Sequence, residues 1–156
     1  MTLARIFAAS VGLVVLPCIA VAGDVVLTFT HGDQSIEFDM AALTDLGETQ
    51  FTTTTSWTDG EQDFVGVSLH TFLEQVGVQD GALKATAIND YAVDIPVSDA
   101  VEGGPIIAYH RNGEEMSVRD KGPLWIVYPY DTNPAYQTEV IYSRSIWQLD
   151  RITVVE

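Results

Sequence analysis

The feature that most constrains the fold is an apolar run, Leu124 to Tyr128, which lies between Gly122-Pro123 and Pro129. The run is rich in β-branched and aromatic residues, and the prolines limit its length, so it predicts a short buried strand. The segment that follows, Pro129 to Tyr142, carries more polar and aromatic side chains than a simple connection needs. Because loops held by strands commonly carry binding groups, we expect the binding site in this region.

One helix is predicted by apolar residues at helical spacing. Leu69, Phe72, Leu73 and Val76 stand at positions i, i+3, i+4 and i+7. Ser68 is in position to cap this helix, and Gly77 to end it. A second, short helix is expected from Asp39, a favourable N-cap residue, to Leu46.

The rest of the chain predicts short strands separated by turn residues. The expected strands are Val25 to Thr30, Ile36 to Phe38, Gln50 to Ser56, Leu83 to Ile88, Tyr91 to Ile95, Ile106 to His110, Glu114 to Ser117 and Leu149 to Val155. Many short strands with few helices indicate an α+β or mostly β domain. We expect residues 23–156 to form this domain alone.

Residues 1–22 have the pattern of a signal peptide. Arg5 supplies a positive charge, Ile6 to Ile19 is largely apolar, and Ala20-Val21-Ala22 has the small-x-small form of a signal peptidase site. We predict cleavage after Ala22 and an exported protein that is not embedded in the membrane. A lipid anchor on Cys18 is disfavoured by the preceding proline, and an uncleaved anchor by the shortness of the apolar stretch.

Cysteine usage and charge exclude several classes of function. Cleavage would remove the only cysteine, Cys18, so the mature chain would have no disulfide, thiolate nucleophile or cysteine metal ligand. It would carry 6 basic and 22 acidic residues, a net charge of −16. This acidity disfavours nucleic acid and anionic lipid, and it serves either solubility alone or a basic partner surface. The three histidines have no metal-ligand spacing, so we assign no metal site.

Four stretches of the chain have an order and spacing that match a known pattern. They are Phe64-Val-Gly-Val-Ser-Leu69, Ala87-Ile-Asn-Asp-Tyr91, Gly122-Pro-Leu-Trp-Ile-Val-Tyr-Pro129 and Arg144-Ser-Ile-Trp-Gln-Leu149. Together, over roughly Phe51 to Val155, they resemble the oxidoreductase molybdopterin-binding domain, which often has Asp-Gly-Tyr at the second stretch and Gly-Pro-Leu-Arg-Leu-Val-x-Pro at the third. The resemblance implies the α+β sulfite-oxidase fold, with mixed β-sheets and few short helices.

One difference from this family concerns its cofactor. The family's enzymes hold molybdenum through a cysteine thiolate, which the resemblance places between Thr52 and Trp57. This chain has hydroxyl side chains there, which are poor substitutes for a soft thiolate. The phosphate tail of molybdopterin also needs cations, and only Arg144, Arg119 and Lys121 stand in or near the expected site. We therefore expect no molybdenum redox chemistry.

If the thiolate for molybdenum and the cations for a phosphate tail are not required, the family's fold still implies a pocket for a pterin ring. The chain resembles a small exported subgroup, the periplasmic pterin-binding regulators of membrane-bound diguanylate cyclase–phosphodiesterases. The resemblance implies a non-catalytic periplasmic protein that binds a reduced pterin without molybdenum. It would signal its ligand state to the periplasmic domain of a membrane receptor that controls cyclic-di-GMP. One alternative is a small molybdopterin-dependent oxidoreductase or a subunit of one, and another is a ligand-free adaptor.

A pterin ring needs an aromatic face on which to stack. Trp57 is a candidate because it stands in a polar loop, and Trp147 because it matches a family position near the pterin. Tyr91 and Tyr128 are further candidates for the pocket wall. For each of the four, the alternative is ordinary packing, and Trp125, inside the apolar run, is expected to belong to the core.

The polar edge of a pterin calls for a carboxylate at its donors and an arginine at its carbonyl. Arg144 is the candidate for the carbonyl, from its family position and the scarcity of cations in the chain. Its alternative role is a surface ion pair, worth at most about 1 kcal/mol. Asp90 and Asp131 compete for the carboxylate role, and Asp90 is also typical of a turn.

Overall fold

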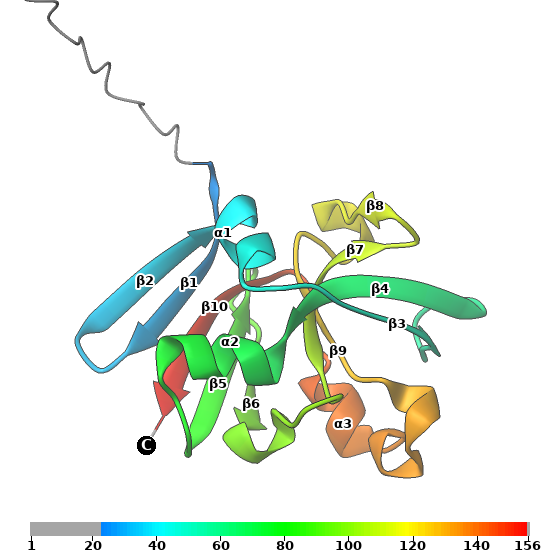
Figure 1. Ribbon diagram of the computed structural model, residues 1–156. Coiled ribbons are helices and arrows are strands. Elements are labelled where there is room, and N and C mark those ends of the chain that lie inside the picture. The colour runs from blue at the N-terminus through cyan, green and yellow to red at the C-terminus, as the bar shows by residue number, and fades with distance from the viewer. Residues whose placement is uncertain (1–22, 156) are drawn as a thin grey trace, which may run out of the picture.

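The computed structural model describes residues 23–155, which form two five-stranded β-sheets and three short α-helices (Figure 1). The predicted α+β class is confirmed. The predicted signal peptide, with its cleavage site after Ala22, lies outside the described residues. Within residues 23–155, no helix is long and apolar enough to span a bilayer.

The first sheet joins the two ends of the described chain. Its strands are β1 (Val25–His31), β2 (Gln34–Asp39), β5 (Ala82–Ala87), β6 (Ala92–Pro96) and β10 (Leu149–Val155), in the order β2-β1-β10-β5-β6. β1 and β10 run parallel, whereas the other pairs are antiparallel, so the sheet is mixed. β10 therefore lies between the β1–β2 hairpin and the β5–β6 hairpin, and it joins the two hairpins into one sheet.

The second sheet is antiparallel. Its strands are β3 (Thr49–Thr54), β4 (Glu61–Ser68), β7 (Ile106–Arg111), β8 (Glu114–Glu115) and β9 (Trp125–Val127). Their order is β3-β4-β7-β8, and β9 also pairs with β7. The predicted strand over Leu124 to Tyr128 is confirmed as β9, and all five residues of the run are fully buried. The predicted strand over Glu114 to Ser117 is shorter than expected, with only two residues in β8.

Two of the helices were predicted from their caps and apolar spacing. In α1 (Met40–Asp45), the Asp39 carboxylate accepts a hydrogen bond from the amide of Ala42 at 2.8 Å. In α2 (Leu69–Val76), Phe72 packs against Phe29 of β1 and Phe38 of β2, with ring centroids 5.7 and 5.4 Å apart. Gly77 ends α2 with φ +75°, as expected. The Ser68 side chain forms no cap, and the first amide of α2 donates to the carbonyl of Pro105 instead.

The segment expected to be a loop, Pro129 to Tyr142, is more regular than predicted. It contains two 3-10 turns, Tyr130–Thr132 and Pro134–Tyr136, and most of a third helix, α3 (Glu139–Arg144). The Thr138 hydroxyl caps α3 by accepting from the amide of Ile141 at 3.3 Å. Apolar periodicity does not reveal this helix because it has only six residues, of which one is buried.

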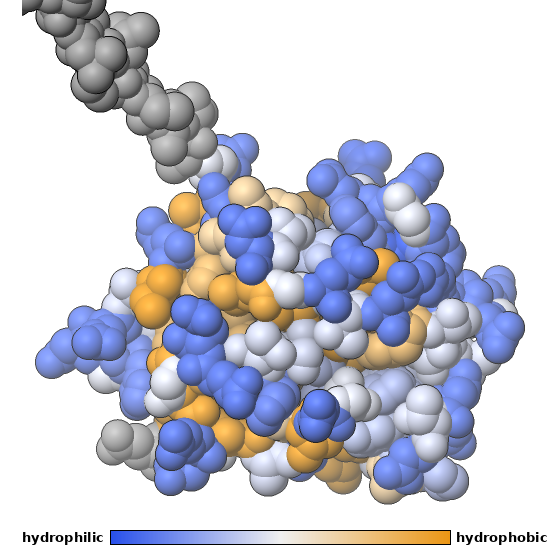
Figure 2. Space-filling model, in the orientation of Figure 1, coloured by the Kyte–Doolittle hydropathy of each residue, from blue (hydrophilic) through white to orange (hydrophobic). Residues whose placement is uncertain are grey.

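The outer surface carries the excess of acidic residues. Figure 2 shows hydrophilic residues spread over the visible face, most densely at the side that holds β8. Hydrophobic residues show through mainly on the side of β1, β2 and α2, where Val25 and Ile36 are exposed. The large apolar side chains are otherwise enclosed in a core that includes both sheets and the buried side of α2.

The pairing of β4 with β7 depends on a glycine. A Cβ atom on Gly66 would lie 2.1 Å from the carbonyl oxygen of Ile107 and 2.6 Å from the Cα atom of Ala108. Both obstacles are backbone atoms in the central pair of the second sheet, so no side-chain rotation relieves the clash. The close approach of these two strands therefore requires a residue without a side chain at position 66.

We expect Gly66→Ala to lower the free energy of unfolding by about 1–3 kcal/mol, the usual cost of overpacking a core. Urea unfolding followed by circular dichroism measures this. Gly23→Ala is the control, because the three atoms nearest its Cβ would be side-chain atoms of Asp39, at 3.0 to 3.4 Å, and not backbone atoms. A Gly66→Ala protein as stable as Gly23→Ala would contradict the close approach.

Candidate functional site

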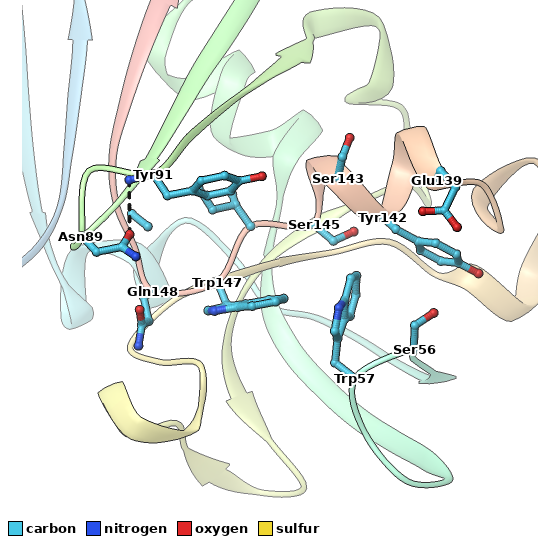
Figure 3. Close-up of a pocket in the computed structure, with 12 residues that line it drawn as sticks. Ser56, Trp57, Asn89, Tyr91, Glu139, Tyr142, Ser143, Ser145, Trp147 and Gln148 are labelled. Carbon is cyan, nitrogen blue, oxygen red and sulfur yellow. Dashed lines mark hydrogen bonds between the residues drawn. The ribbon is translucent and has the colours of Figure 1, made fainter.

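A pocket among the described residues lies where the two sheets meet α3 (Figure 3). Its volume is about 600 Å³, enough for a small ring-shaped ligand. Four segments supply the lining: the β3–β4 loop, the β5–β6 turn, α3, and the connection from α3 to β10. The lining residues are Ser56, Trp57, Ala87, Asn89, Tyr91, Glu139, Tyr142, Ser143, Ser145, Ile146, Trp147 and Gln148.

Two indole rings form a rigid corner of this pocket. The planes of Trp57 and Trp147 meet at 71°, with centroids 5.5 Å apart. Trp57 also contacts Tyr142, at 5.8 Å, and the buried Trp125, at 5.9 Å, in edge-to-face geometry. The amide of Trp57 donates to the hydroxyl of Thr55, which anchors the loop. Since several aromatic contacts hold each indole, the corner presents fixed apolar faces to a flat ligand.

A lysine lies against the same aromatic group. The Lys121 amine is 5.2 Å from the ring centroid of Trp147 and 5.8 Å from that of Trp125, within the range of cation–π attraction. The backbone amide of Gln148 donates to the backbone carbonyl of Lys121 at 3.0 Å, which ties the two segments together. Lys121 thus supports the indoles but does not itself line the pocket.

Some polar side chains of the lining already have partners within the protein. Ser145 is buried, donates to the carbonyl of Ile141 and accepts from the hydroxyl of Tyr130 at 2.6 Å. Burial raises the pKa of Tyr130 to about 12, so this hydroxyl stays a donor. The side-chain amide of Gln148 donates to the backbone carbonyl of Val118 at 2.6 Å. By contrast, we find no hydrogen bond or ion pair within residues 23–155 for the side chain of Glu139.

Three of the seven predicted site residues line this pocket: Trp57, Tyr91 and Trp147. Tyr91 lies on the β5–β6 side, across the pocket from Glu139 on α3 (Figure 3). The structure therefore brings together three of the four aromatic candidates, from three separate segments of the chain, while Tyr128 lies outside the lining. Their role as pterin contacts remains a prediction.

Asp131 lies in a neighbouring cavity of about 260 Å³, which shares Ser56 and Tyr142 with the main pocket. Its carboxylate accepts from the backbone amide of Thr54 at 2.6 Å and from the Thr54 hydroxyl at 2.8 Å. These hydrogen bonds, the backbone one foremost, hold the pKa of Asp131 below its usual value. The observed role of Asp131 is to fasten the segment after β9 to β3.

Arg144 and Tyr128 meet at a carboxylate outside the pocket. Arg144 Nη1 and the Tyr128 hydroxyl each donate to Asp99 Oδ2 at 2.8 Å. Burial, followed by the charge of Asp99, raises the pKa of Tyr128 and keeps it protonated. Because the Arg144 and Asp99 side chains are 22% and 16% exposed, their ion pair is partly buried rather than on the surface. The guanidinium is thus occupied in joining α3 to the segment after β6.

Asp90 also lies outside the pocket lining. It stands in the β5–β6 turn with φ +66°, and its carboxylate accepts from Arg151 Nη2 at 2.7 Å. The same guanidinium nitrogen donates to the carbonyl of Ala87 at 3.0 Å. This geometry agrees with the alternative role of Asp90 as a turn residue.

Several lining residues were not predicted from the sequence. They are Ser56, Ala87, Asn89, Glu139, Tyr142, Ser143, Ser145, Ile146 and Gln148. Glu139, Tyr142 and Ser143 have the spacing i, i+3 and i+4, which places them on one face of α3. Had the segment been identified as a helix, this spacing would have grouped them. Within residues 23–155, we find no group of three side chains suited to hold a metal ion.

We expect Arg144→Ala to lower the free energy of unfolding by about 1–3 kcal/mol, because Asp99 would lose its charged donor in a partly buried place. Chemical unfolding of the purified protein measures this. Arg119→Ala is the control, since Arg119 is exposed and we find no ion pair for it in the described part of the chain. Equal stability of the two variants would show that the Arg144–Asp99 pair contributes nothing.

Comparison with known proteins agrees with this architecture. The model of the oxidoreductase molybdopterin binding domain matches residues 27–134, more than half of the chain. The match ends before α3, so Arg144 and Trp147 lie beyond it. A comparison with curated proteins found no match. The predicted family is confirmed, while its finer subgroup stays a prediction. By this match, with which its sheets agree, the chain belongs to the oxidoreductase molybdopterin-binding domain family.

Proposed function

We propose that this protein is a periplasmic, non-catalytic pterin-binding protein. It binds a reduced pterin without molybdenum in the pocket between the β3–β4 loop and α3. It then signals its ligand state to the periplasmic domain of a membrane receptor that controls cyclic-di-GMP. The observation that carries the proposal is the fixed corner formed by Trp57 and Trp147, in a pocket whose lining includes no thiol and no cation.

The family's cofactor is molybdopterin, and the residues of this pocket do not fit it. The only cysteine of the chain is Cys18, so no thiolate stands in the β3–β4 loop, where the lining offers the hydroxyl of Ser56. A hydroxyl is a hard ligand and a poor substitute for a thiolate at molybdenum. The lining also lacks Lys and Arg, which a phosphate tail calls for. We therefore assign no redox step to this site.

A pterin ring without metal or phosphate suits the same residues better. Its faces are flat and aromatic, and the two indoles offer stacking surfaces set at an angle to each other. Its edges carry donors and acceptors, for which the amide of Asn89 and the carboxylate of Glu139 stand in the lining. A few polar groups in a mostly aromatic pocket are typical of small-molecule sites.

Support for export and signalling comes from the sequence. Residues 1–22 have the pattern of a signal peptide, and the remaining chain carries a net charge of −16. Such a surface attracts a basic partner and repels anionic lipid. These features favour a protein that acts by binding another protein outside the cytoplasm.

A second candidate function is a small molybdopterin-dependent oxidoreductase or a subunit of one, which the family match favours. Elemental analysis of protein purified from its native compartment separates the two. Stoichiometric molybdenum would contradict the pterin proposal. A reduced, fluorescent pterin released on denaturation, without molybdenum, would support it.

We expect Trp57→Ala to weaken the binding of a reduced pterin about tenfold or more, since stacking on an aromatic ring contributes roughly 1–3 kcal/mol. Titration followed by tryptophan fluorescence measures the affinity. Trp57→Phe keeps a flat face and should retain most of the binding, and circular dichroism checks that both variants fold. Unchanged affinity in a folded Trp57→Ala protein would place the ligand elsewhere.

Signalling requires that the ligand change the affinity for the partner, because a ligand that binds both states equally shifts no equilibrium. We expect reduced pterin to raise the affinity for the receptor's periplasmic domain by about 5- to 150-fold, the usual range of coupling. Pull-downs with and without pterin measure this, with Trp57→Ala, whose pterin binding is weakened, as the control at a pterin concentration too low to saturate it. Equal capture in all samples would leave a storage or adaptor role.

A further inference from the structure

The charge of the pocket lining points to a basis for ligand selection. Apart from tyrosines, the one ionisable side chain among the lining residues is Glu139, and it is negative. We infer that Glu139 makes the pocket selective for pterins without phosphate, by accepting from the donor edge of the ring and by repelling a phosphorylated tail. This inference rests on the proposed function, pterin binding, and names the class of pterin that the site takes.

The position of Glu139 leaves its carboxylate free for a ligand. It is the first residue of α3, and the cap of this helix is already formed by the Thr138 hydroxyl, which accepts from the amide of Ile141. Within residues 23–155 we find no hydrogen bond or ion pair for the Glu139 side chain, which is exposed. Together with Tyr142 and Ser143, it lies on the face of α3 that lines the pocket (Figure 3).

The cations closest to the pocket do not offset this charge. Arg144 is paired with Asp99 at 2.8 Å. Arg151 is paired with Asp90 at 2.7 Å and with Asp150 at 2.9 Å. Lys121 lies over the faces of Trp125 and Trp147 rather than in the lining. A phosphorylated ligand would therefore meet a carboxylate without a compensating donor cation among the lining residues.

The chemistry of the two ligand classes makes the selection measurable. The amino-pyrimidinone edge of a pterin presents adjacent N–H donors, and an ionised carboxylate can accept two of them at once. The tail leaves the ring at the end opposite to this edge, so a triphosphate with about four negative charges lies roughly 14 Å from the carboxylate, and its repulsion in water amounts to about a three- to sevenfold loss of affinity at low ionic strength. An amide at position 139 would retain the shape, lose one acceptor and remove the charge.

The test compares two probes with the same ring, 7,8-dihydroneopterin and its triphosphate, on the wild-type protein and on Glu139→Gln. At low ionic strength, we expect the wild type to prefer the unphosphorylated probe by about three- to sevenfold. Glu139→Gln should weaken dihydroneopterin binding about tenfold, as one charge-assisted hydrogen bond is lost, and should strengthen triphosphate binding. The control Glu114→Gln removes the same charge from the exposed strand β8 and should leave both affinities unchanged.

The outcomes separate this inference from the proposed function. If the wild type binds dihydroneopterin but Glu139→Gln keeps the same ratio of affinities, pterin binding stands and the role of Glu139 is wrong. A wild type that prefers the triphosphate also overturns the inference. If neither probe binds the wild type, while circular dichroism shows a folded protein, the proposed function and this inference both fail.

Discussion

The packing of one buried indole, Trp125, supports both the second sheet and the pocket. Trp125 lies in β9, fully enclosed, and its ring stands at 90° to that of Phe64 in β4, with centroids 5.3 Å apart. On its other sides it contacts Trp57 and Trp147, which form the corner of the pocket. Its Nε1 donates to the carbonyl of Ser145 at 3.2 Å. Trp125 thus connects the core to the corner of the pocket, and close packing in the core restrains both lining indoles.

The arginines in ion pairs lie outside the pocket lining, whereas the lining itself contains a carboxylate. The chain has few cations, and three of its arginines join distant segments through carboxylates: Arg111 to Asp120, Arg144 to Asp99 and Arg151 to Asp90. Of these three pairs, Arg144–Asp99 alone has both side chains partly buried, but all three leave their guanidinium groups occupied. The pocket lining retains a carboxylate and no cation, which is the opposite of what an anionic, metal-bearing cofactor requires. Membership of a cofactor-binding family and a pocket unsuited to that cofactor are therefore compatible in one chain.

The candidate site could be predicted only in part. Trp57 was a candidate because it stands in a polar loop and Trp147 because it matches a family position, with ordinary packing as the alternative for each, and both line the pocket. Arg144 was chosen for the scarcity of cations, yet its guanidinium pairs with Asp99, 45 residues away. Glu139 had no distinguishing pattern, since an acidic residue in a chain with 22 of them carries little information. Its place in the lining follows from the packing of α3.

The sequence by itself determined the local elements and the family. Apolar spacing, Asp39 and Gly77 predicted α1 and α2, and the run from Leu124 to Tyr128 predicted β9, because these patterns act over a few residues. Only the tertiary structure decided which strands pair and which side chains meet. The parallel pairing of β1 with β10 joins opposite ends of the described chain, and Asp131 accepts from Thr54, 77 residues away. Such contacts form because the folded core brings distant segments together, and no short-range pattern in the sequence encodes them.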